Sequence, residues 1–166
     1  MPSPVAIITG AASGIGEALT QNLLAKEWRV VMVDINAIKG RSLAEELGSN
    51  VVFYEIDVSF WEAKFKLFEQ AHKWSGHRFD FLASNAGVAD TRNLAEGLVE
   101  EDGALKRPNY KPIETNLIGS IYSFQLFAHY VGKRKNDNGG KIVLTSSGAG
   151  QFECQVIPYI AHLSMG

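Results

Sequence analysis

The sequence contains little cysteine and no long apolar run. Cys154 is its one cysteine in 166 residues, which excludes an internal disulfide and is typical of a protein from a reducing compartment. The apolar run before Gly10 is too short for the core of a signal peptide, and no run approaches membrane-spanning length. We therefore expect a cytoplasmic protein with no membrane partner.

Charge and histidine spacing argue against two further classes of protein. The formal net charge is -2 at pH 7, and the largest basic cluster, residues 133–135, precedes a polar stretch typical of a solvated turn. We therefore expect no nucleic-acid partner. The four histidines lack metal-ligand spacing with one another and with Cys154, so we expect no metal site. A composition that is 46% hydrophobic and 20% charged predicts one domain over residues 1–166.

A glycine-rich segment stands between an expected strand and an expected helix. Gly10, Gly14 and Gly16 follow the β-branched run of residues 5–8 and precede the amphipathic residues 17–24. Such a turn binds anions well, because backbone N–H groups and the helix dipole point into it and no Cβ blocks the approach. An ordinary turn that needs glycine for its geometry alone is the alternative. The number and position of the glycines favour nucleotide binding.

Strands and helices alternate along the rest of the chain. The loss of periodicity over residues 88–108 predicts a polar loop at the functional edge of the domain. Long crossovers between strands predict a parallel sheet in an α/β fold. We expect strands at residues 29–34, 50–57, 79–84 and 141–146, and helices at residues 37–47 (capped by Asn36), 61–74 (with Phe65, Phe68 and Ala71 on one face) and 110–131.

The residues at the carboxyl ends of these strands are polar or glycine, and ligands of parallel sheets bind at that edge. They are Gly10, Asp34, Asp57, Asn85 and Ser147. Asp34 follows Gly16 by 18 residues, close to the spacing at which a carboxylate meets the adenosine ribose. A carboxylate there repels a 2′-phosphate, which favours NAD over NADP. The alternative role for Asp34 is to cap the next helix.

Further motifs occur in a specific order. They are Thr9-Gly10-x-x-x-Gly14-Ile15-Gly16, Asp57-Val58, Asn85-Ala86-Gly87, Asn116, Ser147 and Tyr159. With this series the sequence resembles the short-chain dehydrogenase/reductase family over nearly its whole length. The resemblance implies a Rossmann-type, doubly wound parallel sheet of about five strands in the order 3-2-1-4-5. It also implies that the chain lacks the last strands and helices of the family and is incomplete at its C-terminus.

The resemblance assigns roles to individual residues. Asn116 would hold a water in a proton relay, Ser147 would hydrogen-bond the oxygen of a small alcohol or ketone substrate, and Tyr159 would be the general acid/base. Hydride would pass between NAD, or less favourably NADP, and that substrate. The residues implied to bind the cofactor are Gly10, Ser13, Gly14, Ile15, Gly16, Asp34, Asp57, Val58, Asn85, Ala86 and Gly87.

The sequence departs from the family pattern near its catalytic residues. Leu163 stands where the family has a lysine four residues after the tyrosine, and leucine cannot lower a tyrosine pKa. His162 is the nearest titratable group, and a histidine without a role is the simpler reading. The interval from Ser147 to Tyr159 is one residue shorter than usual, which Ser146 would restore, although the Ser-x-x-Gly pattern favours Ser147.

These departures leave a second function open. The chain could be a catalytically impaired, shortened family member that only binds dinucleotide or a protein partner. Its fifth strand, rich in Ile142, Val143 and Leu144, would then be an exposed edge through which the chain could associate with itself or with another protein.

Overall fold

The computed structural model describes residues 2–89, 99, 102–132 and 139–147, and its centre is a parallel five-stranded sheet in the order β3-β2-β1-β4-β5. The predicted strand order is confirmed. Along the chain the elements are β1 (Val5–Thr9), α1 (Gly14–Leu24), β2 (Arg29–Asp34), α2 (Ala37–Leu47), β3 (Val51–Glu55), α3 (Trp61–Trp74), β4 (Phe81–Ser84), the π-helix η1 (Ile113–Ile118), α4 (Gly119–Gly132) and β5 (Lys141–Leu144).

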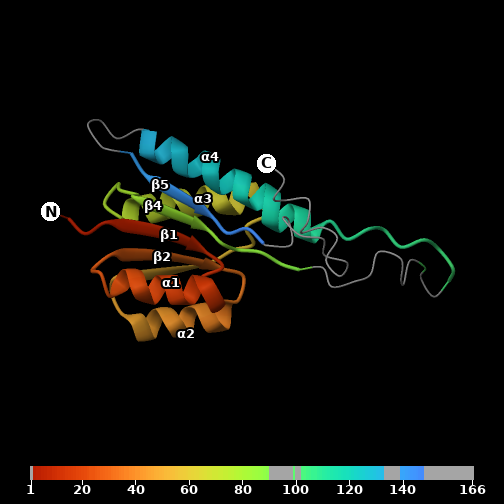
Figure 1. Cartoon of the computed structure of the whole chain (residues 1–166), viewed down its shortest axis with the longest axis horizontal. Coiled ribbons are helices and arrows are strands. Elements are labelled where there is room, and N and C mark those ends of the chain that lie inside the picture. The colour runs from red at the N-terminus through yellow and green to blue at the C-terminus, as the bar shows by residue number, and fades with distance from the viewer. Residues whose placement is uncertain (1, 90–98, 100–101, 133–138, 148–166) are drawn as a thin grey trace.

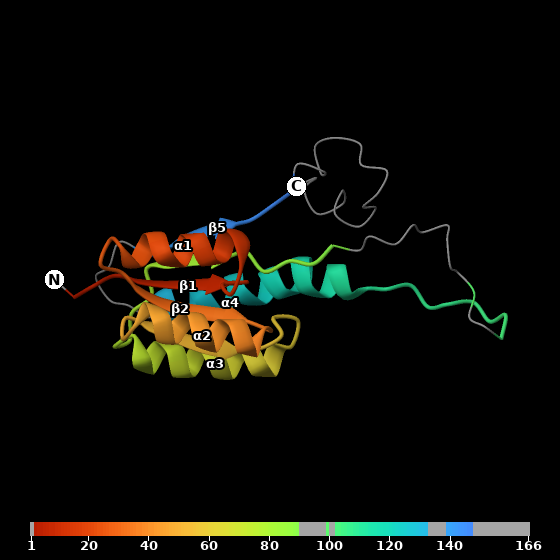
Figure 2. The same ribbon diagram turned by 90° about the horizontal axis from the view of Figure 1, so that it is seen from below.

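Helices cover both faces of the sheet (Figures 1 and 2). Successive residues of a strand point to opposite faces, so Ile7 and Val31 pack with α3 and α4 while Ile8 and Met32 pack with α1 and α2. All four side chains are fully buried. Burial on both faces explains why these strands are continuous apolar runs instead of alternating ones.

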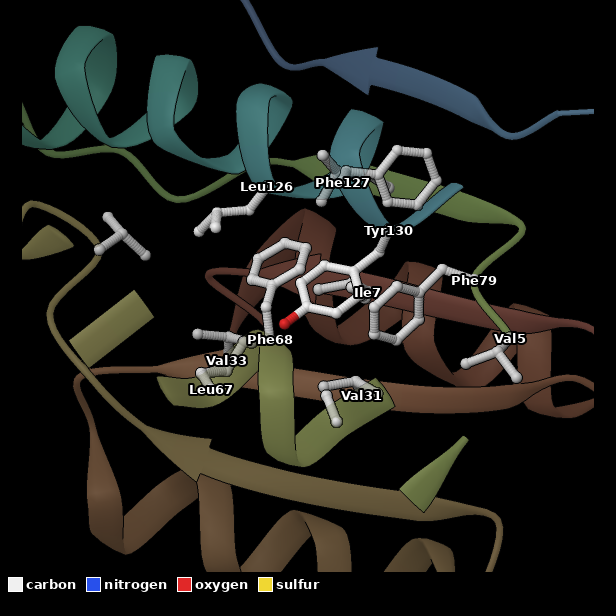
Figure 3. Close-up of a cluster of buried hydrophobic side chains, with 13 residues drawn as sticks. Val5, Ile7, Val31, Val33, Leu67, Phe68, Phe79, Leu126, Phe127 and Tyr130 are labelled. Atoms are coloured by element: carbon white, nitrogen blue, oxygen red, sulfur yellow. The ribbon is translucent and has the colours of Figure 1, made fainter. Parts of the chain in front are cut away.

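Aromatic side chains fill the layer between the sheet and α3 with α4 (Figure 3). The Phe68 and Phe79 rings meet edge to face with their centroids 5.8 Å apart, and Tyr130 meets Phe79 in the same way at 5.9 Å. Burying each phenylalanine stabilises the fold by about 1.5–3 kcal/mol. This layer fixes α4 against the sheet.

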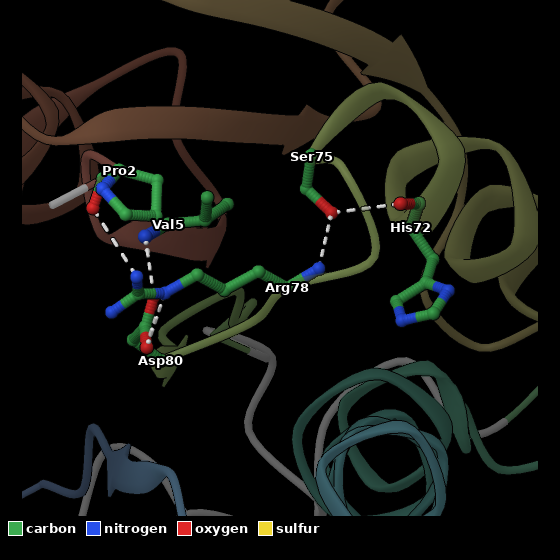
Figure 4. Close-up of polar contacts among 6 residues, drawn as sticks. All are labelled: Pro2, Val5, His72, Ser75, Arg78 and Asp80. Carbon is green, nitrogen blue, oxygen red and sulfur yellow. Dashed lines mark hydrogen bonds and ion pairs between the residues drawn. The ribbon is translucent and has the colours of Figure 1, made fainter. Parts of the chain in front are cut away.

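Polar contacts hold the amino ends of the strands, at the end of the sheet opposite the strand ends that carry the motifs (Figure 4). The Asp80 carboxylate accepts hydrogen bonds from the Val5 N–H at 2.8 Å and from Arg78 Nε at 2.9 and 2.7 Å. Arg78 also donates to the Pro2 carbonyl at 3.2 Å. The amino ends of β1 and β4 are thereby held together.

The helix ends include one confirmed cap. Asn36 accepts a hydrogen bond from the Lys39 N–H at 3.1 Å through its side chain, as the sequence predicts for the start of α2. Gly48 ends α2 with a φ of +87°, a conformation that favours glycine.

Some expected details are wrong. The stretch expected as one regular helix over residues 110–131 is helical from Lys111 to Gly132, but it contains the π-helix η1 before α4. β4 begins at Phe81 instead of residue 79. On α3, Phe65 is 41% exposed, and Lys64 is buried instead. In the part of the chain that the structure describes, β5 is an edge strand, and its Val143 and Leu144 are 51% and 56% exposed.

Candidate functional site

The carboxyl ends of β1, β2 and β4 and the segment after β3 surround one pocket of about 420 Å³. Nearly every cofactor-binding residue that the sequence predicts lines it. The lining residues are Gly10, Ser13, Gly14, Ile15, Asp34, Ile35, Ile56, Asp57, Val58, Asn85, Ala86, Gly87, Val88, Lys111, Thr115 and Thr145. Gly16 is the exception. It does not line the pocket, but it lets α1 pack closely on the end of β1.

Glycine suits each of these three positions in the turn for a different physical reason. A Cβ on Gly16 would lie 2.0 Å from the Gly10 carbonyl oxygen, so only glycine lets α1 pack this closely on the end of β1. Gly10 has a φ of +68°, and a Cβ there would lie 2.9 Å from the Ala86 Cα. Gly14 has a φ of +55°, lines the pocket, and has no protein atom within 4 Å of its Cβ position. The turn is therefore closed on the protein side and open on the pocket side.

The Asp34 carboxylate ties the glycine turn to the start of α2. Its Oδ2 accepts a hydrogen bond from the Ala12 N–H at 2.9 Å, and its Oδ1 accepts one from the Asn36 N–H at the same distance. Asp34 therefore supports the backbone before α2, while the side-chain cap of that helix is Asn36 itself. The carboxylate also lines the pocket, so its structural role and a ligand contact are compatible.

Thr9 organises the Asn85-Ala86-Gly87 segment. Its hydroxyl oxygen accepts hydrogen bonds from the N–H groups of Asn85 and Ala86, both at 3.0 Å. The Asn85 side chain donates to the Thr9 carbonyl at 3.2 Å and accepts from the Thr145 hydroxyl at 3.0 Å. The segment is thereby tied to β1 on one side and to the residue after β5 on the other.

Asp57 is held by two neighbours. Its Oδ1 accepts from the Ser59 N–H at 3.0 Å and from the Ser59 hydroxyl at 2.7 Å, and Lys111 Nζ donates to its Oδ2. Burial alone would raise the pKa of the Asp57 carboxyl, but the hydrogen bonds from Lys111 and Ser59 outweigh it and hold the pKa below its usual value. Asp57 is therefore an anion in the pocket wall at neutral pH.

Asn116 lies in η1, and its side chain is hydrogen-bonded to Val88, the residue that follows Gly87. Its side-chain amide accepts from the Val88 N–H at 2.8 Å and donates to the Val88 carbonyl at 2.9 Å. Its own carbonyl accepts a hydrogen bond from the Ser120 hydroxyl at 2.7 Å. Isolated π-helical turns are frequent at functional sites, because the extra residue re-aims side chains and backbone groups. Asn116 thus fixes one wall of the pocket through Val88.

The remaining predicted catalytic residues lie at or beyond the end of the described chain. Ser146 and Ser147 follow β5 and are both exposed. Tyr159, His162 and Leu163 lie outside the described residues, as does Cys154. The structure therefore brings the residues predicted to bind a cofactor together around one pocket, and the roles of the catalytic residues stay predictions.

Sequence reasoning missed six residues that line the pocket. Three of them are apolar, Ile35, Ile56 and Val88, and three are polar, Lys111, Thr115 and Thr145. Lys111 and Thr115 belong to the stretch expected as a continuous helix, where nothing in the spacing marks them as facing a ligand. Thr145 precedes the serine motif directly, and its place at the end of the fifth strand was the available signal.

Two kinds of feature are absent from the residues that the structure describes. None of the helices resolved here has the length and apolarity needed to cross a membrane. No group of three or more His, Cys, Asp or Glu side chains in the same residues has a geometry that could hold a metal ion.

Comparison with known proteins identifies the family. A sequence profile described as short chain dehydrogenase matches residues 4–161. The chain belongs to the short-chain dehydrogenase/reductase family. The short-chain dehydrogenase/reductase ascJ of Acremonium egyptiacum is 31% identical over 156 residues, which cover 93% of this chain and 51% of that protein. The chain spans about half the length of the curated relatives it matches.

Other members differ in cofactor. An NADP-dependent dehydrogenase of a Phoma species is 30% identical over 129 residues, covering 75% of this chain and 38% of that protein. A short-chain dehydrogenase/reductase from Burkholderia phymatum, crystallised in complex with NAD, superposes with a TM-score of 0.79 at 24% identity. That alignment covers 93% of this chain and 53% of the other, and it shows the shared fold.

Proposed function

We propose that residues 1–166 form one dinucleotide-binding domain of an oxidoreductase that transfers hydride between NAD and a secondary alcohol or ketone. The observation that supports this most directly is the single pocket that joins the glycine turn to Asp34 and Asp57. The single cysteine of the chain favours a reducing compartment, and we propose the cytoplasm.

The glycine turn fits a pyrophosphate. The open side of Gly14 leaves room where any larger residue would place a Cβ, and α1 begins at this residue with its N-terminal amides and positive dipole end. When bound, the nicotinamide accepts or supplies the hydride. The residues of the turn bind and orient; they take no part in the chemistry.

Asp34 supports NAD over NADP. The Ala12 and Asn36 N–H groups hold its carboxylate at the pocket wall next to the glycine turn. Ribose hydroxyls would donate to this carboxylate, whereas a 2′-phosphate would meet its negative charge. We infer that the chain prefers NAD.

Proton transfer would depend on Asn116, Ser147 and Tyr159. Ser147 would donate to the substrate oxygen, Tyr159 would exchange the proton, and Asn116 would hold a water of the relay. An unperturbed tyrosine has a pKa near 10 and is a poor base at neutral pH. Leu163 offers no charge to lower it, so we propose slow turnover for the chain as it stands.

A second candidate is dinucleotide or partner binding without turnover. Leu163 favours it, and the exposed β5 edge offers a surface for self-association or for another protein. Size-exclusion chromatography of the 166-residue chain over a range of concentrations tests self-association.

The experiment that separates the two candidates combines binding with turnover. The full chain is titrated calorimetrically with NADH and then assayed with a panel of secondary alcohols and ketones, alongside Leu163→Lys. Binding with turnover that rises in Leu163→Lys supports the oxidoreductase. Binding of NADH with no turnover in either protein supports the second candidate. Absence of NADH binding by the folded chain contradicts both the oxidoreductase and dinucleotide binding without turnover.

A further inference from the structure

One buried hydroxyl in the pocket wall has no hydrogen-bond partner. Among the residues that the structure describes, Thr115 Oγ1 is the buried side-chain polar atom that makes no hydrogen bond. The residue is 6% exposed and lines the same pocket as the glycine turn. A buried hydroxyl without a partner destabilises a fold, and folded proteins rarely contain one. The free chain is therefore less stable than it would be with an apolar residue of the same shape at this position.

The winding of the helix around Thr115 explains why its hydroxyl is unpaired. In a regular α-helix a serine or threonine hydroxyl commonly donates to the carbonyl four residues earlier. Three hydroxyls of α1 and α4 do so, at 2.9, 2.7 and 3.0 Å, namely those of Thr20, Ser120 and Ser123. Thr115 lies in η1, where the Gly119 N–H donates five residues back, to the Glu114 carbonyl. The wider π turn leaves the Thr115 hydroxyl without the partner that the other three have.

The polar side chains next to Thr115 in η1 and one turn before it are bonded elsewhere. The amide of Asn116 accepts from the Val88 N–H and donates to the Val88 carbonyl. Lys111, four residues before Thr115, has its ammonium on the Asp57 carboxylate. Both side chains are already fixed by these bonds. The missing partner of the hydroxyl is therefore expected from the pocket side, which Thr115 lines.

The Thr115 side chain can present its hydroxyl to the pocket without a change of backbone. A threonine in a helix occupies either of two side-chain rotamers, and rotation about the Cα–Cβ bond can bring the hydroxyl into the place of the methyl group. A ligand that offers a hydrogen-bond partner favours the rotamer in which the hydroxyl faces it. The unpaired state thus belongs to the empty pocket.

The place of Thr115 in the fold indicates which part of a dinucleotide it would meet. One turn before it Lys111 contacts Asp57, and four residues after it a Cβ on Gly119 would lie 3.1 Å from Val58 Cγ2. Asp57 and Val58 follow β3, which is one edge of the sheet. The residues expected to meet substrate and nicotinamide follow β5, the other edge strand of the described sheet. Thr115 therefore lies on the side of the pocket away from the expected chemistry.

We propose that Thr115 is a binding residue whose hydroxyl is paired only in the occupied pocket, where it hydrogen-bonds the ADP-ribose part of the dinucleotide. The proposal rests on the proposed dinucleotide function. Valine at this position removes an unpaired hydroxyl from the free chain and a paired one from the complex. It therefore raises stability and lowers affinity, whereas a residue that only packs in the wall would not move the two in opposite directions.

The first measurement is thermal unfolding of the full chain without ligand, for wild type, Thr115→Val and Thr20→Val. We expect Thr115→Val to raise the midpoint by about 2–8 °C. Thr20→Val is the matched control, because it removes a buried helical hydroxyl that is paired, and it should lower the midpoint. A midpoint that is unchanged or lower in Thr115→Val overturns the inference, because the hydroxyl would then already be satisfied in the free chain.

The second measurement gives the dissociation constants of NADH and ADP-ribose for wild type, Thr115→Val and Thr115→Ser. In Thr115→Val both constants should rise at least about fivefold, and in Thr115→Ser, which keeps the hydroxyl, both should stay within about threefold of wild type. Unchanged constants in Thr115→Val, or a rise for NADH alone, overturn the inference and leave the proposed function standing. If folded wild type binds neither ligand, the proposed function fails and this inference fails with it.

Discussion

Lys64 of α3 donates a hydrogen bond to Ser123 Oγ of α4 over 2.6 Å, and the lysine is fully buried. Its Nζ also donates to the carbonyl of Gly119, the residue at which η1 passes into α4. A Cβ on Gly119 would lie 3.1 Å from Val58 Cγ2, so α4 packs closely against the pocket wall here. Lys64 thus joins α3 to the junction that carries Asn116 and contacts the site.

Burial of Lys64 predicts a distinct pH dependence of stability. Burial lowers its pKa from 10.5 to about 7, and the charge of Asp57 opposes the shift only in part. Between these values the unfolded chain binds a proton that the folded chain does not, so the stability from this group rises with pH. Below pH 7 both states are protonated and the whole penalty is present.

The measurement is urea unfolding between pH 7 and 10 for wild type, Lys64→Met and Lys66→Met. We expect the free energy of unfolding of wild type to carry a contribution with a slope of up to about 1.4 kcal/mol per pH unit from this lysine. Lys64→Met loses that slope, and Lys66→Met, at an exposed position of the same helix, retains it. Equal slopes in all three proteins would show that Lys64 titrates normally.

Thr9→Val is expected to destabilise the chain by about 2–4 kcal/mol, because valine has the same shape and cannot accept hydrogen bonds. The N–H groups of Asn85 and Ala86 would both lose their acceptor. Thr9→Ser keeps the oxygen and should cost about 1 kcal/mol for the lost methyl group. Chemical denaturation measures both; a Thr9→Val variant as stable as Thr9→Ser would contradict the role given to the hydroxyl.

Gly16→Ala is expected to cost at least about 3 kcal/mol and to abolish dinucleotide binding, because its Cβ would meet the Gly10 carbonyl at 2.0 Å. The control is Gly48→Ala, where φ is +87° but no atom lies within 4 Å of the Cβ position. That change should cost about 1 kcal/mol through backbone strain alone and leave NADH affinity unchanged. Thermal unfolding and NADH titration of both variants check the contrast, which fails if Gly16→Ala still binds NADH normally.

Asp34→Ser is expected to change the cofactor preference. Removal of the carboxylate takes away the repulsion of a 2′-phosphate, so the ratio of NADPH to NADH affinity should rise by at least about tenfold. The variant also loses the hydrogen bonds to Ala12 and Asn36, so its fold is checked by circular dichroism. A folded variant with an unchanged ratio would show that Asp34 has only its structural role.

The sequence allowed the sheet to be predicted, and also most of the residues that gather around the pocket, because both depend on local patterns. Apolar runs predict strands, and the requirement for glycine at positions 10 and 16 follows from a close backbone approach that any residue with a Cβ would prevent. The strand-end rule predicts that Asp34 and Asn85 lie at the same end of the sheet, and both line the pocket.

Other features depend on contacts between distant parts of the chain. Periodicity predicts Phe65 as a packing residue on α3, whereas the hydrogen-bond partners in α4 make Lys64 the buried one. The π-helix before α4 changes the register of a stretch that reads as regular, and with it the direction of Lys111 and Asn116. No single-sequence pattern encodes these partnerships.

Calorimetric titration of the folded 166-residue chain with NADH, with NADPH in a parallel experiment, tests the central claim most directly. We predict one binding site, tighter binding of NADH than of NADPH, and loss of both in Gly16→Ala. Absence of NADH binding by the folded wild-type chain would contradict the dinucleotide site, and tighter binding of NADPH would contradict the role assigned to Asp34.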